Sequence, residues 1–321
     1  MNTELKTYID NSKLAPFLSK SSITDISYNG VSLFYQDNIK GRAKANIDFT
    51  AEEAIAFIRQ IANMAEKQFS YQNPILDISV ANYRINAVHS SIVRLGDEKS
   101  ISFCIRIGSI ESRILHNYSF MNRKVRSILK DFLKKKYSIV IAGETGTGKT
   151  ELQKYLLSSL EDNTRIIIID NIQELDSVRQ NEALDITSWQ LNPNVSEGTF
   201  ERLIRNALRS NPDWLVIAES RGKEMNDVLN SVLTGHPIIT TLHAYDINSI
   251  PARITRMVEM SDSSQKYDDI YHDVMEHMKA YIFLKREVNH RGNIVRYISE
   301  IAISDSKKLN IVYKRGKYNE K

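Results

Sequence analysis

The stretch Gly143-Glu-Thr-Gly-Thr-Gly-Lys-Thr150 decides the fold. An apolar run over 138–142 precedes it and a helical pattern over 149–160 follows it, which predicts strand, loop and helix in succession. Glycines there let backbone N–H groups converge on a phosphate, and the helix N-terminus adds partial positive charge. At the end of the loop, the ammonium of Lys149 can bind phosphate and the hydroxyl of Thr150 can ligate Mg²⁺. We predict that ATP and Mg²⁺ are bound by Gly143, Glu144, Thr145, Gly146, Thr147, Gly148, Lys149 and Thr150.

The rest of the second half repeats this alternation. Continuous apolar runs at 166–170, 215–218 and 238–242 are separated by amphipathic patterns at 200–208 and 225–233. Apolar strands between amphipathic helices are typical of a parallel sheet that is covered on both faces. We therefore predict an α/β domain.

The first third has a different pattern. Asn29-Gly30 predicts a hairpin turn, 52–66 has helical spacing, and 75–80, 84–88 and 101–107 read as strands. This predicts a smaller α+β domain with short strands and one helix. We expect domains at 1–110 and 123–321, with a linker at 111–122.

Acidic side chains follow the predicted apolar strands. Asp170 and Glu174 follow one strand and Glu219 follows the next. A carboxylate there avoids a desolvation cost only beside a cation or water, so we expect Asp170 and Glu219, with Thr150, to ligate Mg²⁺. His243 ends another apolar strand. A lone histidine in such a place is usually a core residue, but this one is expected at the same sheet edge, where it would sense the γ-phosphate.

Composition narrows the class of protein. Lys and Arg exceed Asp and Glu by 43 − 39 = 4, and Cys104 is the only cysteine, which excludes an intrachain disulfide and a multi-cysteine zinc site. The longest apolar runs are far shorter than the roughly 20 residues of a membrane span, and no secretory signal is visible. We expect a cytoplasmic protein with at most peripheral membrane contact. The basic segment 121–137 is either a solvated helix face or a contact for anionic lipid headgroups or a neighbouring subunit.

Further motifs carry a resemblance. Residues 208–224 read Leu-Arg-Ser-Asn-Pro-Asp-Trp-Leu-Val-Ile-Ala-Glu-Ser-Arg-Gly-Lys-Glu, and Thr234-Gly-His-Pro237 and Thr241-Leu-His-Ala244 follow. With the phosphate loop and the acidic box around Glu174, they resemble the secretion ATPase superfamily of type IV secretion and conjugation, type II secretion and type IV pili. Weaker matches lie at 23–30, 84–87 and 105–106, so the resemblance spans about 23 to 300.

The resemblance implies a RecA-like P-loop domain and roles for several side chains. Glu174 matches a glutamate that polarises the attacking water, while Glu219 and His243 match the second acidic strand and the histidine box. Arg205 and Arg209 fall where the family places arginines that reach a neighbouring subunit's nucleotide. Arg106 matches an arginine that approaches the nucleotide from the N-terminal domain.

These matches imply a cytoplasmic ATPase, expected to form a homo-hexamer, at the inner face of the cell membrane. Its partners would be inner-membrane components of a type IV secretion or conjugation apparatus, without direct nucleic-acid binding. The nearest alternative is a type IV pilus or type II secretion ATPase. Asp170-Asn171 stands where the family commonly has Glu-Asp, and Ala218 where it has Gly. The Asp170-Asn171 departure suggests another alternative, an ATP-binding assembly scaffold that hydrolyses ATP slowly. The basic segment 121–137 suggests a nucleic-acid translocase, which we rank last.

Overall fold

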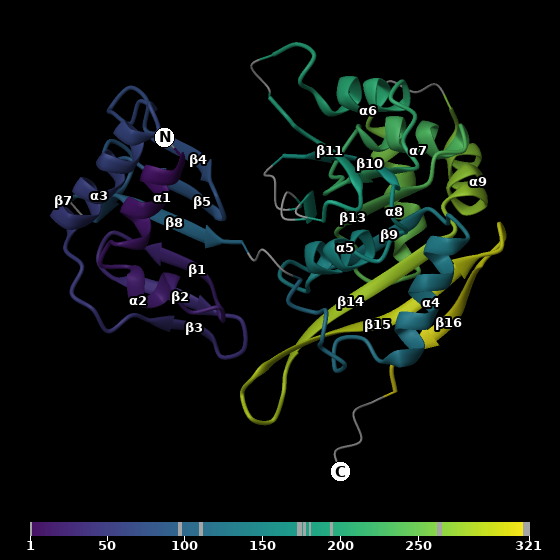
Figure 1. The fold of residues 1–321 in the computed structure, drawn as a ribbon, viewed down its shortest axis with the longest axis horizontal. Helices are drawn as coiled ribbons and strands as arrows, with labels where there is room; N and C mark the ends of the chain where they lie inside the picture. The colour runs from purple at the N-terminus through teal and green to yellow at the C-terminus, as the bar shows by residue number, and fades with distance from the viewer. Residues whose placement is uncertain are drawn as a thin grey trace. The chain divides into compact units, whose positions relative to one another are not determined.

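The chain folds into two compact units. The computed structural model describes residues 2–95, 98–108, 112–171, 175, 178–179, 181–192, 195–261 and 265–316 (Figure 1). One unit comprises 1–110 with 288–294, and the other comprises 111–287 with 295–321. The mixture of a smaller α+β unit and a larger α/β unit confirms the predicted fold class.

The N-terminal unit is built on a six-stranded sheet in the order β3-β2-β1-β8-β5-β4. Every recorded pairing in it is antiparallel. Alternate residues of β8 are buried, namely Phe103, Ile105 and Ile107, while Arg106 is exposed, as the sequence pattern predicts. The strands are β1 (Ile23–Tyr28), β2 (Leu33–Asp37), β3 (Gly41–Lys44), β4 (Ile75–Val80), β5 (Tyr83–Val88) and β8 (Ser102–Ile107), beside a two-stranded ribbon of β6 (Arg94–Leu95) and β7 (Glu98–Lys99).

Three helices pack with this sheet: α1 (Asn2–Asp10), α2 (Ala15–Leu18) and α3 (Ala51–Met64). The helix predicted at 52–66 is α3, which begins at a capping box formed by Thr50 and Glu53. The expectation of a single helix in this third was wrong. In α1 Leu5 and Ile9 are buried and Tyr8 packs against the same core, and this pattern of two turns is too short to establish a helix from sequence.

The second unit is built on an eight-stranded sheet in the order β11-β10-β12-β13-β9-β14-β15-β16. The recorded pairings from β11 to β14 are parallel, and β16 pairs antiparallel with β15. Four of the strands are the predicted apolar runs. The strands are β9 (Ile139–Gly143), β10 (Arg165–Asp170), β11 (Asp185–Gln190), β12 (Trp214–Ile217), β13 (Ile238–Leu242), β14 (Ala280–Val288), β15 (Ile294–Ser304) and β16 (Leu309–Lys314).

Helices cover both faces of this sheet. Ile139 and Ile141 of β9 lie in one core with side chains of α4 and α5, whereas Val140 and Ala142 lie in the other core with those of α6, α7, α8 and α9. Because successive residues of a strand point to opposite faces, this division confirms the predicted covered sheet. The helices are α4 (Arg123–Lys134), α5 (Lys149–Leu157), α6 (Phe200–Leu208), α7 (Met225–Leu233), α8 (Ser249–Glu259) and α9 (Tyr267–His277). Within the part of the chain that the structure describes, none of the helices has the length and apolarity of a membrane span.

The segment 112–122 packs onto the second unit. Ile114, Phe120 and Met121 are buried in the same core as α4 and α5. The backbone N–H of Arg113 donates to Oε2 of Glu151 at 2.5 Å, which ties the start of this segment to the first turn of α5. The start of the segment 112–122 is therefore hydrogen-bonded to α5, the helix that follows the phosphate loop.

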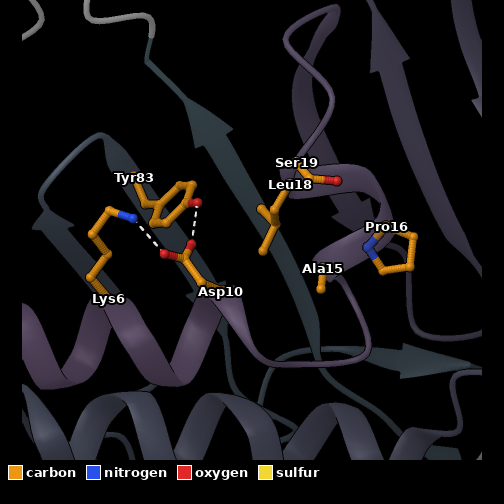
Figure 2. A pocket seen from close by; sticks show the side chains of 7 residues that line it. All are labelled: Lys6, Asp10, Ala15, Pro16, Leu18, Ser19 and Tyr83. Atoms are coloured by element: carbon orange, nitrogen blue, oxygen red, sulfur yellow. Dashed lines mark hydrogen bonds and ion pairs between the residues drawn. The ribbon is translucent and has the colours of Figure 1, made fainter.

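In the N-terminal unit, Asp10 joins α1 to the sheet beside a cavity of about 570 Å³ (Figure 2). The Tyr83 hydroxyl donates to Oδ1 of Asp10 at 2.5 Å, and Lys6 pairs with the other oxygen. Burial acts to raise the pKa of Asp10, but the hydrogen bonds from Lys6 and Tyr83 outweigh it and hold that pKa below its ordinary value. A lowered carboxyl pKa means that the carboxylate favours folding above its unfolded pKa and that this contribution is lost as the pH falls.

Replacing Tyr83 with Phe is expected to loosen α1 from the sheet. Loss of this hydrogen bond should lower local stability by about 1 kcal/mol. Hydrogen exchange of the α1 amides at pH 7 in the full chain measures the effect, and the difference from wild type should shrink as the pH approaches the Asp10 pKa. Tyr35→Phe is the matched control, since the described residues offer its hydroxyl no hydrogen-bond partner. Equal exchange in Y83F and wild type would contradict the expectation.

Candidate nucleotide site

The loop between β9 and α5 is shaped by its glycines and by the neighbouring strand. Gly146 and Gly148 have φ of +75° and +98°, in the region that favours glycine. A Cβ on Gly143 would lie 2.6 Å from the carbonyl oxygen of Leu284 on β14. One on Gly148 would lie 3.2 Å from the ring of Phe120. Glycine is therefore required for backbone conformation at Gly146 and Gly148, and for close approach at Gly143, whose φ of +152° is also positive.

Side chains of the loop bond to its own carbonyls. Nζ of Lys149 donates to the carbonyl oxygens of Gly143 at 3.0 Å and Glu144 at 3.1 Å. The buried Thr147 hydroxyl donates to the Glu144 carbonyl at 2.8 Å. When the loop carbonyls are bonded to side-chain donors in this way, the loop backbone can present N–H groups to an anion. The exposed Glu144 and Thr145 lie at the outer part of the loop.

Three predicted site residues meet at the first glycine of the loop. Nδ1 of His243, just beyond β13, lies 3.0 Å from the carbonyl oxygen of Gly143 and 3.4 Å from Nζ of Lys149. Nε2 of the same ring lies 3.1 Å from Oε1 of Glu219, which follows β12. The parallel pairing of β12, β13 and β9 explains this meeting, because the carboxyl ends of the three strands lie at one edge.

Glu219 is a charged acceptor at this edge. Burial acts to raise its pKa, but the bond from Arg221 at 2.6 Å, with His243 and Lys149 nearby, holds that pKa below its ordinary value. The carboxylate is therefore ionised at neutral pH. Its Oε1 atom is buried and lies 3.1 Å from Nε2 of His243, and apart from that ring it has no hydrogen-bond partner among the described residues. Such an atom suits a water molecule or the hydration shell of a cation.

Asp170 ends β10, adjacent to β12, and is buried. Its Oδ2 atom accepts the backbone N–H of Leu175 at 3.4 Å. Glu174, predicted to polarise water, lies outside the described residues, whereas Asn171 is described and exposed.

The predicted Mg²⁺ ligands fit the chemistry of that ion. Asp170, Glu219 and Thr150 offer oxygen atoms, from two adjacent strand ends and the first turn of α5. The described residues contain no group of three or more His, Cys, Asp or Glu that would hold a metal unaided. A Mg²⁺ ion here would take its remaining ligands from phosphate oxygens and water, as Mg²⁺ commonly does.

The predicted arginines lie elsewhere. Arg205, on α6, donates to Oδ1 of the buried Asp227 of α7 at 2.8 Å and keeps an exposed side chain. Arg209 is exposed just after α6. Arg106 lies on β8 of the N-terminal unit, where it pairs with Asp25 at 3.3 Å. Their predicted roles at a nucleotide need a second subunit or the other unit, and they remain predictions.

Sequence reasoning missed a second set of residues at the loop. Nε of Arg296, on β15, donates to the carbonyl oxygen of Gly146 at 2.5 Å. Nη1 of Arg286, on β14, lies 3.2 Å from where a Cβ of Gly146 would be. No motif marks either arginine, and both stand far along the chain from the loop. Only the neighbouring position of their strands in the sheet brings them there.

Replacing Gly143 with Ala is expected to disrupt the site, because the added methyl group would overlap the Leu284 carbonyl. Overpacking of this kind costs about 1–3 kcal/mol. Urea unfolding of the full chain, followed by the fluorescence of Trp189 and Trp214 in strands of the second unit, measures the loss. Gly235→Ala is the control, since that glycine also has a positive φ but nothing within 4 Å of the added atom. An equal loss in the two variants would show that backbone conformation, rather than the contact with β14, requires glycine at 143.

Comparison with known proteins identifies the family. The family model of "Type II/IV secretion system protein" matches residues 88–280. An uncharacterised protein of Bacillus anthracis is 30% identical over 315 residues, which cover 93% of this chain and 70% of that protein. The type IV secretion system protein VirB11 of Bartonella quintana is 27% identical, over 78% of this chain and 80% of that protein. The ATPase DotB of Legionella pneumophila has a similar fold, with a TM-score of 0.69 and 18% identity over 95% of this chain and 82% of DotB. The chain belongs to the family of type II/IV secretion system proteins.

Proposed function

We propose that this chain is an ATP hydrolase that powers macromolecule transport or pilus biogenesis by a type IV secretion or conjugation apparatus. The observation that carries the proposal is the contact of His243 with both Lys149 and Glu219 at the phosphate loop. Nδ1 of His243 lies 3.4 Å from Nζ of Lys149, and Nε2 lies 3.1 Å from Oε1 of Glu219. An ammonium, an imidazole and an ionised carboxylate at one loop can bind phosphates, respond to their charge and orient water.

Each side chain has a separate task in this proposal. Lys149 holds the β- and γ-phosphates, and Thr150, with Asp170 and Glu219, holds Mg²⁺. When bound, Mg²⁺ neutralises charge on the phosphate oxygens. Glu219 keeps a water molecule or the ion's hydration shell in place through its buried Oε1 atom, and Arg221 fixes the other oxygen. His243 contacts both Lys149 and Glu219 and is placed to respond to the γ-phosphate. Glu174 remains the proposed base for the attacking water.

Hydrolysis is tested by steady-state phosphate release with Mg²⁺ and ATP. Lys149→Ala and Glu219→Gln should each slow the reaction by about a hundredfold or more, because each removes charge from the site of phosphoryl transfer. Lys130→Ala, which removes an exposed lysine of α4, should retain the wild-type rate. Equally slow phosphate release by wild type and K149A would contradict ATP hydrolysis. It would favour the ATP-binding assembly scaffold that the Asp170-Asn171 departure suggests.

We further propose that the chain works as a homo-hexamer in which Arg205 and Arg209 of one subunit reach the nucleotide of the next. Both side chains are exposed, and Arg205 is held in a fixed direction by the buried Asp227. Rings suit this arrangement, because a site that borrows an arginine is complete only when a neighbour is present.

Mixing two inactive proteins tests the shared site. An Arg209→Ala subunit retains its phosphate loop, and a Lys149→Ala subunit retains its arginine. If the arginine acts across a boundary, mixed rings recover part of the ATPase activity that neither variant has alone. No recovery, with particle images still showing closed six-fold rings in a non-hydrolysable ATP analogue, would mean that Arg209 acts within its own subunit or not at all.

We place the protein at the cytoplasmic face of the cell membrane, in contact with membrane components of the apparatus. The support is the type IV secretion role printed in the name of the Bartonella relative and the exposed basic face of α4. That helix buries Val125, Leu129, Phe132 and Leu133. Its opposite side exposes Arg123, Lys124, Lys130 and Lys134, followed by Lys135 and Lys136.

A further inference from the structure

The carbonyl of Gly146 is held from outside the phosphate loop. Arg296 of β15 is half-buried, and its Nε donates to this oxygen at 2.5 Å. Arg286, on the neighbouring strand β14, lies on the same side of Gly146. β14 reaches this place because it pairs in parallel with β9 up to Gly143 and then continues beyond the end of β9.

The geometry of the peptide bond links this contact to the interior of the loop. In a trans peptide the C=O of one residue and the N–H of the next point in opposite directions. A Gly146 carbonyl that is fixed toward Arg296 therefore directs the Thr147 N–H away from Arg296. A glycine at this position would otherwise rotate easily, since its φ of +75° is one of several conformations open to it.

The surroundings of Arg296 are strongly positive. Burial, and then the charges of Arg286 and Arg113, lower the pKa of Arg296. A guanidinium nevertheless stays charged in proteins. Gathering like charges at one side of a loop costs free energy, and a bound anion offsets this cost. The positive charge and the directed N–H group therefore favour the same kind of ligand.

We propose that Arg296 is a positioning residue of the phosphate loop, which aims the Thr147 N–H at the phosphate chain of a nucleoside triphosphate. Arg286, with Nη1 3.2 Å from where a Cβ of Gly146 would be, adds positive potential near the loop. This inference rests on the proposed function, because it requires a nucleotide at the loop.

Nucleotide affinity tests the proposal in the full chain. Arg296→Met removes the donor and the charge but keeps an unbranched apolar stem, whereas Arg296→Lys keeps the charge and loses the planar Nε donor. Titration with a fluorescent ATP analogue and Mg²⁺ should show Kd raised about tenfold in R296M, the size expected for one charge-assisted hydrogen bond, with R296K between R296M and wild type. The KM for ATP should rise in parallel while kcat changes little, because a loop N–H binds ground state and transition state alike.

Two controls separate positioning from charge. Lys308→Met removes one exposed positive charge beyond the far end of β15 and should leave Kd unchanged. Repeating the titration at about 0.5 M salt screens an effect of charge alone, whereas a local hydrogen bond persists. A deficit in R296M that survives high salt supports positioning. If R296M does not fold, R296K decides alone, since only positioning predicts a loss with the charge retained.

The remaining outcomes overturn the proposal at different levels. If wild type binds the analogue, Lys149→Ala does not, and both Arg296 variants bind like wild type, the positioning role fails and the proposed function stands. A wild-type Kd in R296K, together with an R296M deficit that vanishes at high salt, also overturns positioning, because charge alone then explains the effect. If wild type itself does not bind the analogue, the proposed function fails together with this inference.

Discussion

The parallel pairing of β9 between β13 and β14 is the constraint on which the site depends. Parallel strands end at one edge of a sheet, so whatever follows them is brought together there. The phosphate loop follows β9, His243 follows β13, and Glu219 follows β12 one strand farther. On the other side, β14 continues beyond β9 and carries Arg286 alongside the loop. The site is thus a consequence of strand order more than of any single loop.

Much of this arrangement could be predicted from sequence, because the signals are local. A buried parallel strand needs a continuous apolar run, and the runs that became β9, β10, β12 and β13 are interrupted by helical patterns. The acids and the histidine stand directly after such runs, so their place at one edge follows once the sheet is parallel. The Asn29-Gly30 turn was equally visible, since Gly30 has a φ of +99° and Oδ1 of Asn29 accepts the N–H groups of Val31 and Ser32.

The remaining features have no local signal. The second half of β14 is exposed and carries charged residues, and β15 is only partly buried over much of its length, so neither pattern resembles a buried strand. The bond from Arg296 to Gly146 joins residues 150 positions apart, and only the sheet order connects them. Likewise, nothing near Arg205 in sequence indicates that its partner is Asp227, a buried acid on the next helix.

The crowding at Gly143 changes how the motif is to be interpreted in relatives. The carbonyl of Leu284 lies 2.6 Å from where a Cβ of residue 143 would be, so the adjacent strand requires glycine there whether or not a nucleotide is bound. A relative that did not hydrolyse ATP would therefore still require glycine at this position, because β14 would still lie against it. A glycine at this position therefore indicates how the strands are packed rather than whether the protein hydrolyses ATP. Lys149, whose proposed role is phosphate binding through its charge, is by contrast the position at which loss of the proposed ATP hydrolysis would remove the need for a particular side chain.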